Sequence, residues 1–133
     1  MPSAANPAGD DGTIANDAGL LRRIRPDQVV HDKNSGEKRP SSAAFKDPEM
    51  SVDAEPILRA NGLDWKFSLG SHPGFSLVRF LAGAARANQL AVVHKPEAGN
   101  PAHTEVIGKK TRGIANNLVA VSDWVHLEKE QAN

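Results

Sequence analysis

The sequence predicts an α+β fold: a single small domain, mainly an antiparallel sheet with two or three short helices. Three observations support this prediction. The chain has 133 residues, a usual length for one domain. Pro and Gly recur at short intervals, which argues against long helices and coiled coils. Short runs containing β-branched or aromatic residues alternate with short helical patterns, so we expect strands interleaved with helices.

The composition also predicts the boundaries of the domain. Residues 1–12 are rich in Ala, Pro, Gly, Asn and Asp, and we expect a disordered leader there. The α+β domain is expected over 13–127, followed by a polar tail over 128–133. The N-terminus lacks the basic and apolar regions of a secretory signal, and no stretch reaches the roughly 18 apolar residues of a membrane span. We therefore expect a cytoplasmic protein with no membrane partner.

Five segments predict strands, because each is short, carries β-branched or aromatic residues and is bounded by turn formers. They are Gln28–His31, Ser41–Lys46, Phe75–Phe80, Leu90–Lys95 and Thr104–Lys109. Lys33–Gly36 predicts a turn, since Asn and Gly tolerate the left-handed backbone that such turns need. The first two strands are therefore expected to form an arm with a long loop.

Three segments predict helices. Asp53 is an expected N-cap, followed by Pro56 in the first turn and Gly62 as the stop. Leu81–Asn88 is a short Ala-rich helix or turn. Thr111–Val125 carries one apolar stripe at helical spacing, with Thr111 as the candidate cap. The expected core consists of Phe45, Phe67, Phe75, Phe80, Val92, Val106, Leu118 and Trp124.

Charge is balanced overall but arranged in blocks. Residues 20–46 and 65–95 each carry four more basic than acidic side chains, and residues 47–64 carry four more acidic ones. The blocks are either solvated faces that pair with one another or parts of one basic surface. Sixteen basic against sixteen acidic residues give no global basic field, so nucleic acid is not an expected partner. Because the chain has no cysteine, disulfides and thiolate metal sites are excluded.

The segment 90–108 carries the candidate catalytic residues. If His94 lies opposite His103, the two-residue period of a strand places Val92, His94, His103, Glu105 and Ile107 on one face. His103 and Glu105 then become the candidate proton-transfer groups. Two alternatives stay open: zinc binding by the histidines, and a solvated hairpin end with no chemistry. No H-E-x-x-H spacing supports a metal, so we expect none.

A second group of residues is suited to an anionic ligand. Arg39, Ser41 and Ser42 offer a guanidinium and two hydroxyls within a short segment, a combination that suits phosphate or carboxylate. The alternative is that the serines only begin a strand. Arg23 is expected to point away from the core, because Ile24 faces it. The chain has neither a Walker loop nor a G-x-G-x-x-G loop, so a P-loop NTPase and a Rossmann cofactor site are not expected.

Four segments carry a resemblance to a family of small uncharacterised bacterial proteins, which covers about four-fifths of the chain. They are Leu21–Ile24, Arg39–Phe45, Asn100–His103 and Gly108–Thr111. A more distant resemblance is to ADP-ribosyltransferase-like folds, which use an Arg, a Ser-centred strand and a later Glu in that order. Arg23, Ser41 or Ser42, and Glu105 occur in this order here, whereas the Ser-Thr-Ser segment has no counterpart. The first resemblance implies no activity.

Two functions are consistent with the sequence. In the first, Arg23, Arg39, Ser41 and Ser42 bind an anionic, phosphate-bearing small molecule such as a nucleotide, beside His103 and Glu105. In the second, the chain is a non-enzymatic protein–protein interaction module of a larger bacterial system. No cofactor is implied, and whether a reaction is catalysed is open. The first hypothesis requires these side chains to line one cleft.

Overall fold

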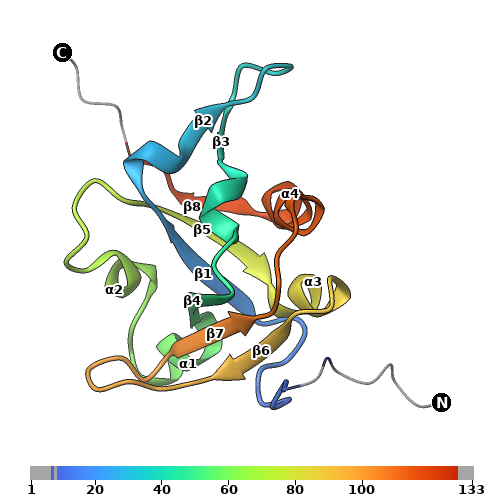
Figure 1. Cartoon of the computed structure of the whole chain (residues 1–133). Helices are drawn as coiled ribbons and strands as arrows, with labels where there is room; N and C mark the ends of the chain where they lie inside the picture. The colour runs from blue at the N-terminus through green and yellow to red at the C-terminus, as the bar shows by residue number, and fades with distance from the viewer. Residues whose placement is uncertain (1–6, 8, 129–133) are drawn as a thin grey trace.

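The computed structural model describes residue 7 and residues 9–128, and it contains a six-stranded sheet in which all neighbours are antiparallel (Figure 1). The strand order is β6-β7-β4-β1-β5-β8. The strands are β1 (Gly19–Ile24), β4 (Glu49–Ala54), β5 (Ser76–Leu81), β6 (Ala91–His94), β7 (His103–Ile107) and β8 (Asp123–His126). A separate hairpin is formed by β2 (Val29–His31) and β3 (Lys38–Pro40). The predicted α+β domain is thus confirmed.

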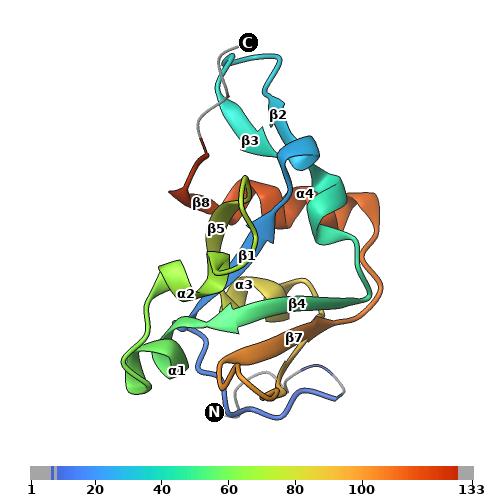
Figure 2. The same cartoon turned by 90° about the vertical axis from the view of Figure 1, so that its left-hand side faces the viewer.

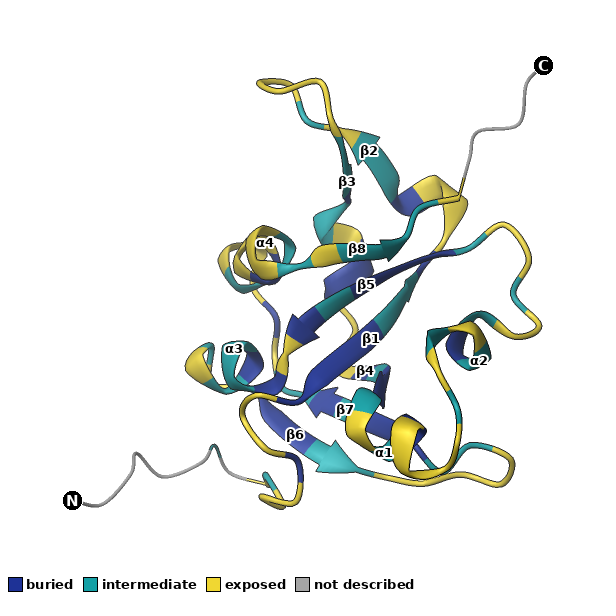
Figure 3. Ribbon diagram, turned by 180° about the vertical axis from the view of Figure 1, so that it is seen from behind, coloured by how far each residue is buried: buried dark blue, intermediate teal, exposed yellow. Residues whose placement is uncertain are grey.

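Helices cover both faces of the sheet. They are α1 (Glu55–Ala60), α2 (Trp65–Leu69), α3 (Ala82–Ala87) and α4 (Arg112–Val121), with two 3₁₀-helices, η1 (Pro26–Gln28) and η2 (Ser42–Phe45). Figure 3 shows α3 and α4 on one side of the sheet and α1 and α2 on the other. We call the first side the α4 face and the second the α1 face. None of the helices in the described part of the chain is long and apolar enough to cross a membrane.

The two faces differ in chemistry because side chains alternate along each strand. The α4 face carries the larger core cluster, which includes Leu20, Met50, Val52, Phe80 and Val106. The α1 face carries a smaller cluster around Leu21, Leu58, Leu77 and Ala102. The strand positions between the core residues put several polar side chains on the α1 face: Arg23, Ser51, Asp53, His103 and Glu105.

Most of the expected core is buried. Phe45, Phe80, Val92, Val106 and Leu118 are each at most 1% exposed. The other three expected core residues are half-buried: Phe67, Phe75 and Trp124. Trp124 packs at the rim, where its indole Nε1 donates to the carbonyl of Lys38 (3.1 Å).

The predicted strand at Ser41–Lys46 is wrong. Residues 42–45 form η2, and the strand of the hairpin lies earlier, at Lys38–Pro40. The physical reason is local capping: the Ser41 side chain accepts a hydrogen bond from the Ala43 amide (3.2 Å), which begins a helical turn. The other predicted strands are confirmed to within a few residues, and the predicted turn at Lys33–Gly36 joins β2 to β3.

Several elements were not predicted: β1, β4, α2 and β8. Asp53 is not a helix cap but a buried residue of β4, and α1 begins at Glu55. The helix expected over 111–125 ends at Val121, because Ser122 is extended and β8 begins at the next residue. The predicted cap is confirmed, since Thr111 Oγ1 accepts from the amide of Ile114 (3.2 Å).

The predicted pairing of His94 with His103 is also wrong. His94 pairs with Thr104, and Val92 pairs with Val106. This register keeps both valines on the buried α4 face, and a slip by one residue would bury Glu105 there instead. His94 and His103 therefore lie on opposite faces, so they cannot share a metal ion. No group of three or more His, Cys, Asp or Glu that could hold one occurs among residues 7 and 9–128.

The N-terminal segment closes one edge of the sheet. Asp10 and Asp11, within the expected leader, accept hydrogen bonds from the amides of Val92 (2.8 Å) and His94 (2.9 Å) in the edge strand β6. Asp10 also forms a two-point ion pair with Arg86 (2.9 and 3.1 Å), in which neither side chain is more than 8% exposed. The rest of the leader, residues 1–6 and 8, and tail residues 129–133 lie outside the described residues.

Asp10→Ala should destabilise the domain, because it leaves the Arg86 guanidinium buried without its partner. We expect the free energy of unfolding to fall by about 3 kcal/mol in urea denaturation. The matched control is Asp17→Ala, at an exposed position. Equal losses in the two variants would contradict the structural role of Asp10.

The same contact predicts acid sensitivity. Burial alone would raise the pKa of Asp10, but hydrogen bonds from Arg86, Val92 and Gly12 outweigh it and hold the pKa below 3.8. The stabilisation is therefore present at neutral pH and is lost as the pH falls from 3.8 through the lowered value. The difference in stability between wild type and Asp10→Ala should shrink over that range.

Candidate functional site

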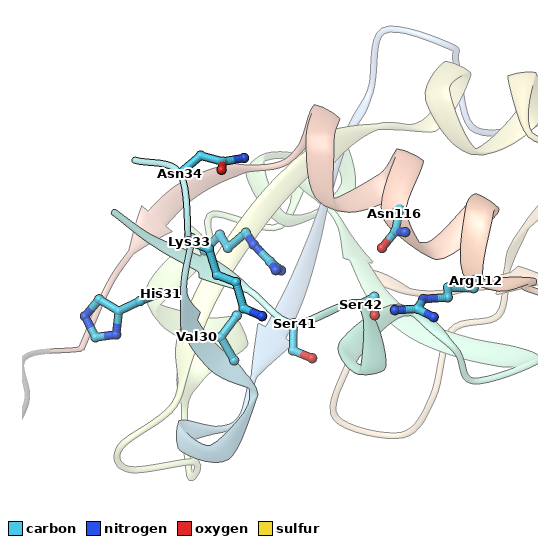
Figure 4. Close-up of a pocket in the computed structure, with 9 residues that line it drawn as sticks. Val30, His31, Lys33, Asn34, Ser41, Ser42, Arg112 and Asn116 are labelled. Atoms are coloured by element: carbon cyan, nitrogen blue, oxygen red, sulfur yellow. The ribbon is translucent and has the colours of Figure 1, made fainter. Parts of the chain in front are cut away.

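A basic hollow lies between the β2–β3 hairpin, η2 and α4 (Figure 4). Its volume is about 490 Å³. Nine residues line it: Val30, His31, Lys33, Asn34, Arg39, Ser41, Ser42, Arg112 and Asn116. Three of them are cationic and none is acidic. We refer to this site as the basic hollow.

Arg39 is held in place by the turn of the hairpin. Its Nε lies 3.6 Å from Asp32 Oδ2, and its Nη1 donates to the carbonyl of Pro40 (3.2 Å). Asp32 in turn accepts from the amides of Asn34 (2.8 Å) and Ser35 (3.0 Å). These amides and the nearby Arg39 lower the pKa of Asp32, so it is ionised at neutral pH. Asp32 orients Arg39 and offsets part of its charge.

The two serines are placed by η2. Ser41 caps η2 through its oxygen, which leaves its hydroxyl proton free to donate. Figure 2 shows η2 beside α4, below the hairpin. This packing brings Ser42 close to the first turn of α4, where Figure 4 shows Arg112 reaching toward it. His31 points away from the hollow in the same view.

Two further cations lie near these segments: Arg22, which is partly buried, and Lys110, which is buried. Arg22 donates to the carbonyls of Ala44 in η2 (3.0 Å) and Ser51 in β4 (2.9 Å). Lys110, 7% exposed, donates to the carbonyls of Val106 (2.9 Å) and Gly108 (3.0 Å). Burial lowers the pKa of Arg22 to about 10 and that of Lys110 to about 8. At neutral pH both groups are cationic, and both interact with the Asp47 carboxylate.

Lys110 predicts an unusual dependence of stability on pH. Its pKa is 10.5 when exposed and about 8 in the fold, so between these values the unfolded chain binds more protons. The free energy of unfolding of wild type, relative to Lys110→Met, should therefore rise by about 1–3 kcal/mol from pH 8 to pH 10.5. Chemical denaturation at several pH values measures this difference. A constant difference would contradict the buried ammonium.

The predicted site residues do not line one cleft. Arg39, Ser41 and Ser42 lie in the basic hollow, whereas Arg23, His103 and Glu105 lie on the α1 face, on the other side of the sheet. The expectation that all six converge is thus not met. The proton-transfer candidates cannot act on a ligand in the basic hollow.

His103 is held at both ring nitrogens. Its Nδ1 lies 2.8 Å from the carbonyl of Lys95, which can only accept, so Nδ1 carries the proton. Its Nε2 faces Ser51 Oγ (3.2 Å) and Glu97 Oε1 (3.3 Å). Neutral His103 accepts from the Ser51 hydroxyl, and protonated His103 pairs with Glu97.

Glu105 forms an ion pair with Lys95 (3.1 Å), and its side chain is 16% exposed. This pair lies where β6 and β7 adjoin on the α1 face. Lys95 therefore orients Glu105 and competes with any external proton donor for the Glu105 carboxylate.

Six of the nine residues that line the basic hollow were not predicted as site residues, among them Lys33, Arg112 and Asn116. Arg112 directly follows the predicted cap Thr111, so the sequence places a cation at the start of that helix. This position could have indicated an anion site together with the Arg-Pro-Ser-Ser segment. Lys33 lies in the predicted turn of the arm. Assigning Lys33 and Arg112 to one site required knowing that η2 packs on α4, and no local sequence pattern shows this packing.

Comparison with known proteins finds no match: neither a protein-family model, nor a curated protein, nor a solved structure matches the chain. The resemblances drawn from the sequence therefore stay hypotheses.

Proposed function

We propose that the basic hollow binds an anionic, phosphate-bearing small molecule of the nucleotide type. The observation that carries the proposal is the meeting of Lys33 and Arg39 from the β2–β3 hairpin with Arg112 from α4, around a hollow with no acidic lining residue. Like charges repel one another, and an anion in the hollow would relieve that repulsion. The two serines supply neutral donors beside the cations.

The residues suit a phosphate group in particular. Guanidinium groups bind phosphate oxygens through two parallel hydrogen bonds, and both Arg39 and Arg112 line the basic hollow. Lys33 supplies a third charge. The first turn of α4 adds its positive end on the side of Ser42. Together these groups favour a ligand that carries one or more phosphates over a simple carboxylate.

The proposal concerns binding rather than catalysis. The lining residues include no carboxylate, and the single histidine points away from the hollow. A ligand held there would lack a general base from the described residues.

A protein–protein interaction module is the second candidate. The observation that favours it is the β2–β3 hairpin, which projects from the domain as a sheet of its own (Figure 1). The basic hollow, which is the proposed phosphate site, lies beside this hairpin. A titration with small anions distinguishes the two functions, because only the phosphate site predicts that such molecules bind.

Arg39→Ala and Arg112→Ala should each weaken binding of ATP, ADP, NAD or pyrophosphate by about 10- to 100-fold. This is the loss expected for one charge-assisted hydrogen bond. Isothermal titration calorimetry measures the dissociation constants, and circular dichroism checks the fold of each variant. Affinity for wild type should also fall with added salt.

The matched control is Arg59→Ala, an exposed arginine at the end of α1. It removes the same charge far from the basic hollow and should leave affinity unchanged. If all three variants weakened binding equally, the loss of affinity would reflect the net charge of the protein and not contacts in the basic hollow. The absence of binding by wild type to every member of the panel at millimolar concentration would contradict the proposed function and favour the interaction module.

A further inference from the structure

A second hollow lies on the α1 face, where Arg23 and Asp53 meet the loop after α2. Its volume is about 310 Å³. It is lined by Arg23, Asp53, Phe67, Ser68, Gly70, Ser71, His72 and Asn100. We call it the mixed-charge hollow, because it holds one cationic and one acidic side chain. It shares no residue with the basic hollow.

Asp53 is a buried carboxylate in the wall of this hollow. The residue is 3% exposed, and its two oxygens accept from Ser68 Oγ (2.6 Å) and Asn100 Nδ2 (2.9 Å). No ion pair joins Asp53 to a cation within the described part of the chain. Each oxygen has a further lone pair. Burial of an ionised group is costly unless a cation or further hydrogen bonds compensate it.

Arg23 is the counterpart of Asp53 on the other wall. Its Nη1 donates to the carbonyl of Ser68 (3.2 Å), and among residues 7 and 9–128 it forms no ion pair with a carboxylate. Ser68 thus contacts both charged groups, through its carbonyl and its hydroxyl, and keeps them at the same hollow. The two charges face the hollow without neutralising one another directly.

The hollow contains a third polar side chain, His72. His72 Nδ1 is buried and forms no hydrogen bond to any described residue. The His72 ring lies against Phe75, with centroids 5.2 Å apart, so its position is fixed by packing. Phe67 contributes an apolar wall. The hollow therefore combines a fixed cation, a fixed anion and a partly apolar surface.

We propose that the mixed-charge hollow binds a free α-amino acid in its zwitterionic form. The ligand carboxylate pairs with the Arg23 guanidinium, and the ligand ammonium donates to Asp53. The ligand side chain lies against Phe67 and within reach of His72. A neutral zwitterion compensates the charges of Arg23 and of the buried Asp53 at once, whereas a phosphate would face the Asp53 carboxylate. This site is independent of the proposed phosphate site and takes a different class of ligand.

The test uses the intact protein and three versions of each probe. Wild-type protein is titrated with the twenty L-amino acids, their amides and their N-acetyl derivatives, and binding is followed by amide NMR shifts. The amide lacks the carboxylate and the N-acetyl derivative lacks the ammonium. We expect at least one free amino acid to bind, with shifts at residues 67–72 and Asn100, and both of its derivatives to bind at least 10-fold more weakly. A derivative that binds as well as its parent, or no binding by any amino acid, overturns the proposal.

Two variants locate the site. Arg23→Gln and Asp53→Asn remove one charge each while keeping side-chain size, and each should weaken binding of the amino acid found above by at least 10-fold. Arg25→Gln, on an exposed residue just beyond β1, is the matched control and should leave the affinity unchanged. Equal affinity in Arg23→Gln and wild type overturns the assignment. If Asp53→Asn unfolds, the derivatives tested on wild type still decide the role of the ammonium.

Discussion

The hydrogen bonding of the partly buried Arg22 guanidinium is the constraint on which the arrangement of the basic hollow depends. Arg22 lies on the same face of β1 as the buried Leu20 and Ile24, and taking its charge out of water is costly. The cost is offset because it donates to the carbonyls of Ala44 in η2 and Ser51 in β4. The ladder between β1 and β4 pairs Leu20 with Ala54 and Leu21 with Asp53, and it ends before Arg22. Beyond that point the Arg22 side chain links β1 to β4 through the Ser51 carbonyl. The side chain thus ties η2 to the sheet and fixes Ser41 and Ser42 opposite α4.

The two hollows follow from the alternation of side chains along the strands. On the α4 face the apolar residues form the main core. Arg22 and Lys110 lie at the margin of this core, and Lys33, Arg39 and Arg112 lie in the hairpin and in α4. On the α1 face the core is smaller, which leaves room for Arg23 and Asp53 between α2 and the sheet. The basic hollow is therefore lined by cations without acidic residues, and the mixed-charge hollow is lined by one cation and one acidic residue. A ligand that suits one is repelled or left unpaired in the other.

The sequence reveals those parts of the fold that depend on local apolar runs. Strands β5, β6 and β7 were predicted because Val, Leu and Phe recur in short bounded segments, while β4 was missed because its Asp53 looks like a helix cap. Ser41 and Ser42 lie beside Arg39 in the chain, so their clustering was predictable. The partnership with Arg112 was not, because it depends on η2 packing against α4. The β6–β7 register required knowing that Val92 and Val106 share the core.

The most direct test of the account is an amide NMR titration of the labelled wild-type protein with a nucleotide panel that includes NAD. Phosphate binding in the basic hollow predicts saturable shifts confined to residues 30–42 and 112–116, the segments that line this hollow. Residues of the mixed-charge hollow, such as Ser71 and His72, should not move. Shifts centred on that second hollow, or none at millimolar nucleotide, would contradict phosphate recognition at the basic hollow.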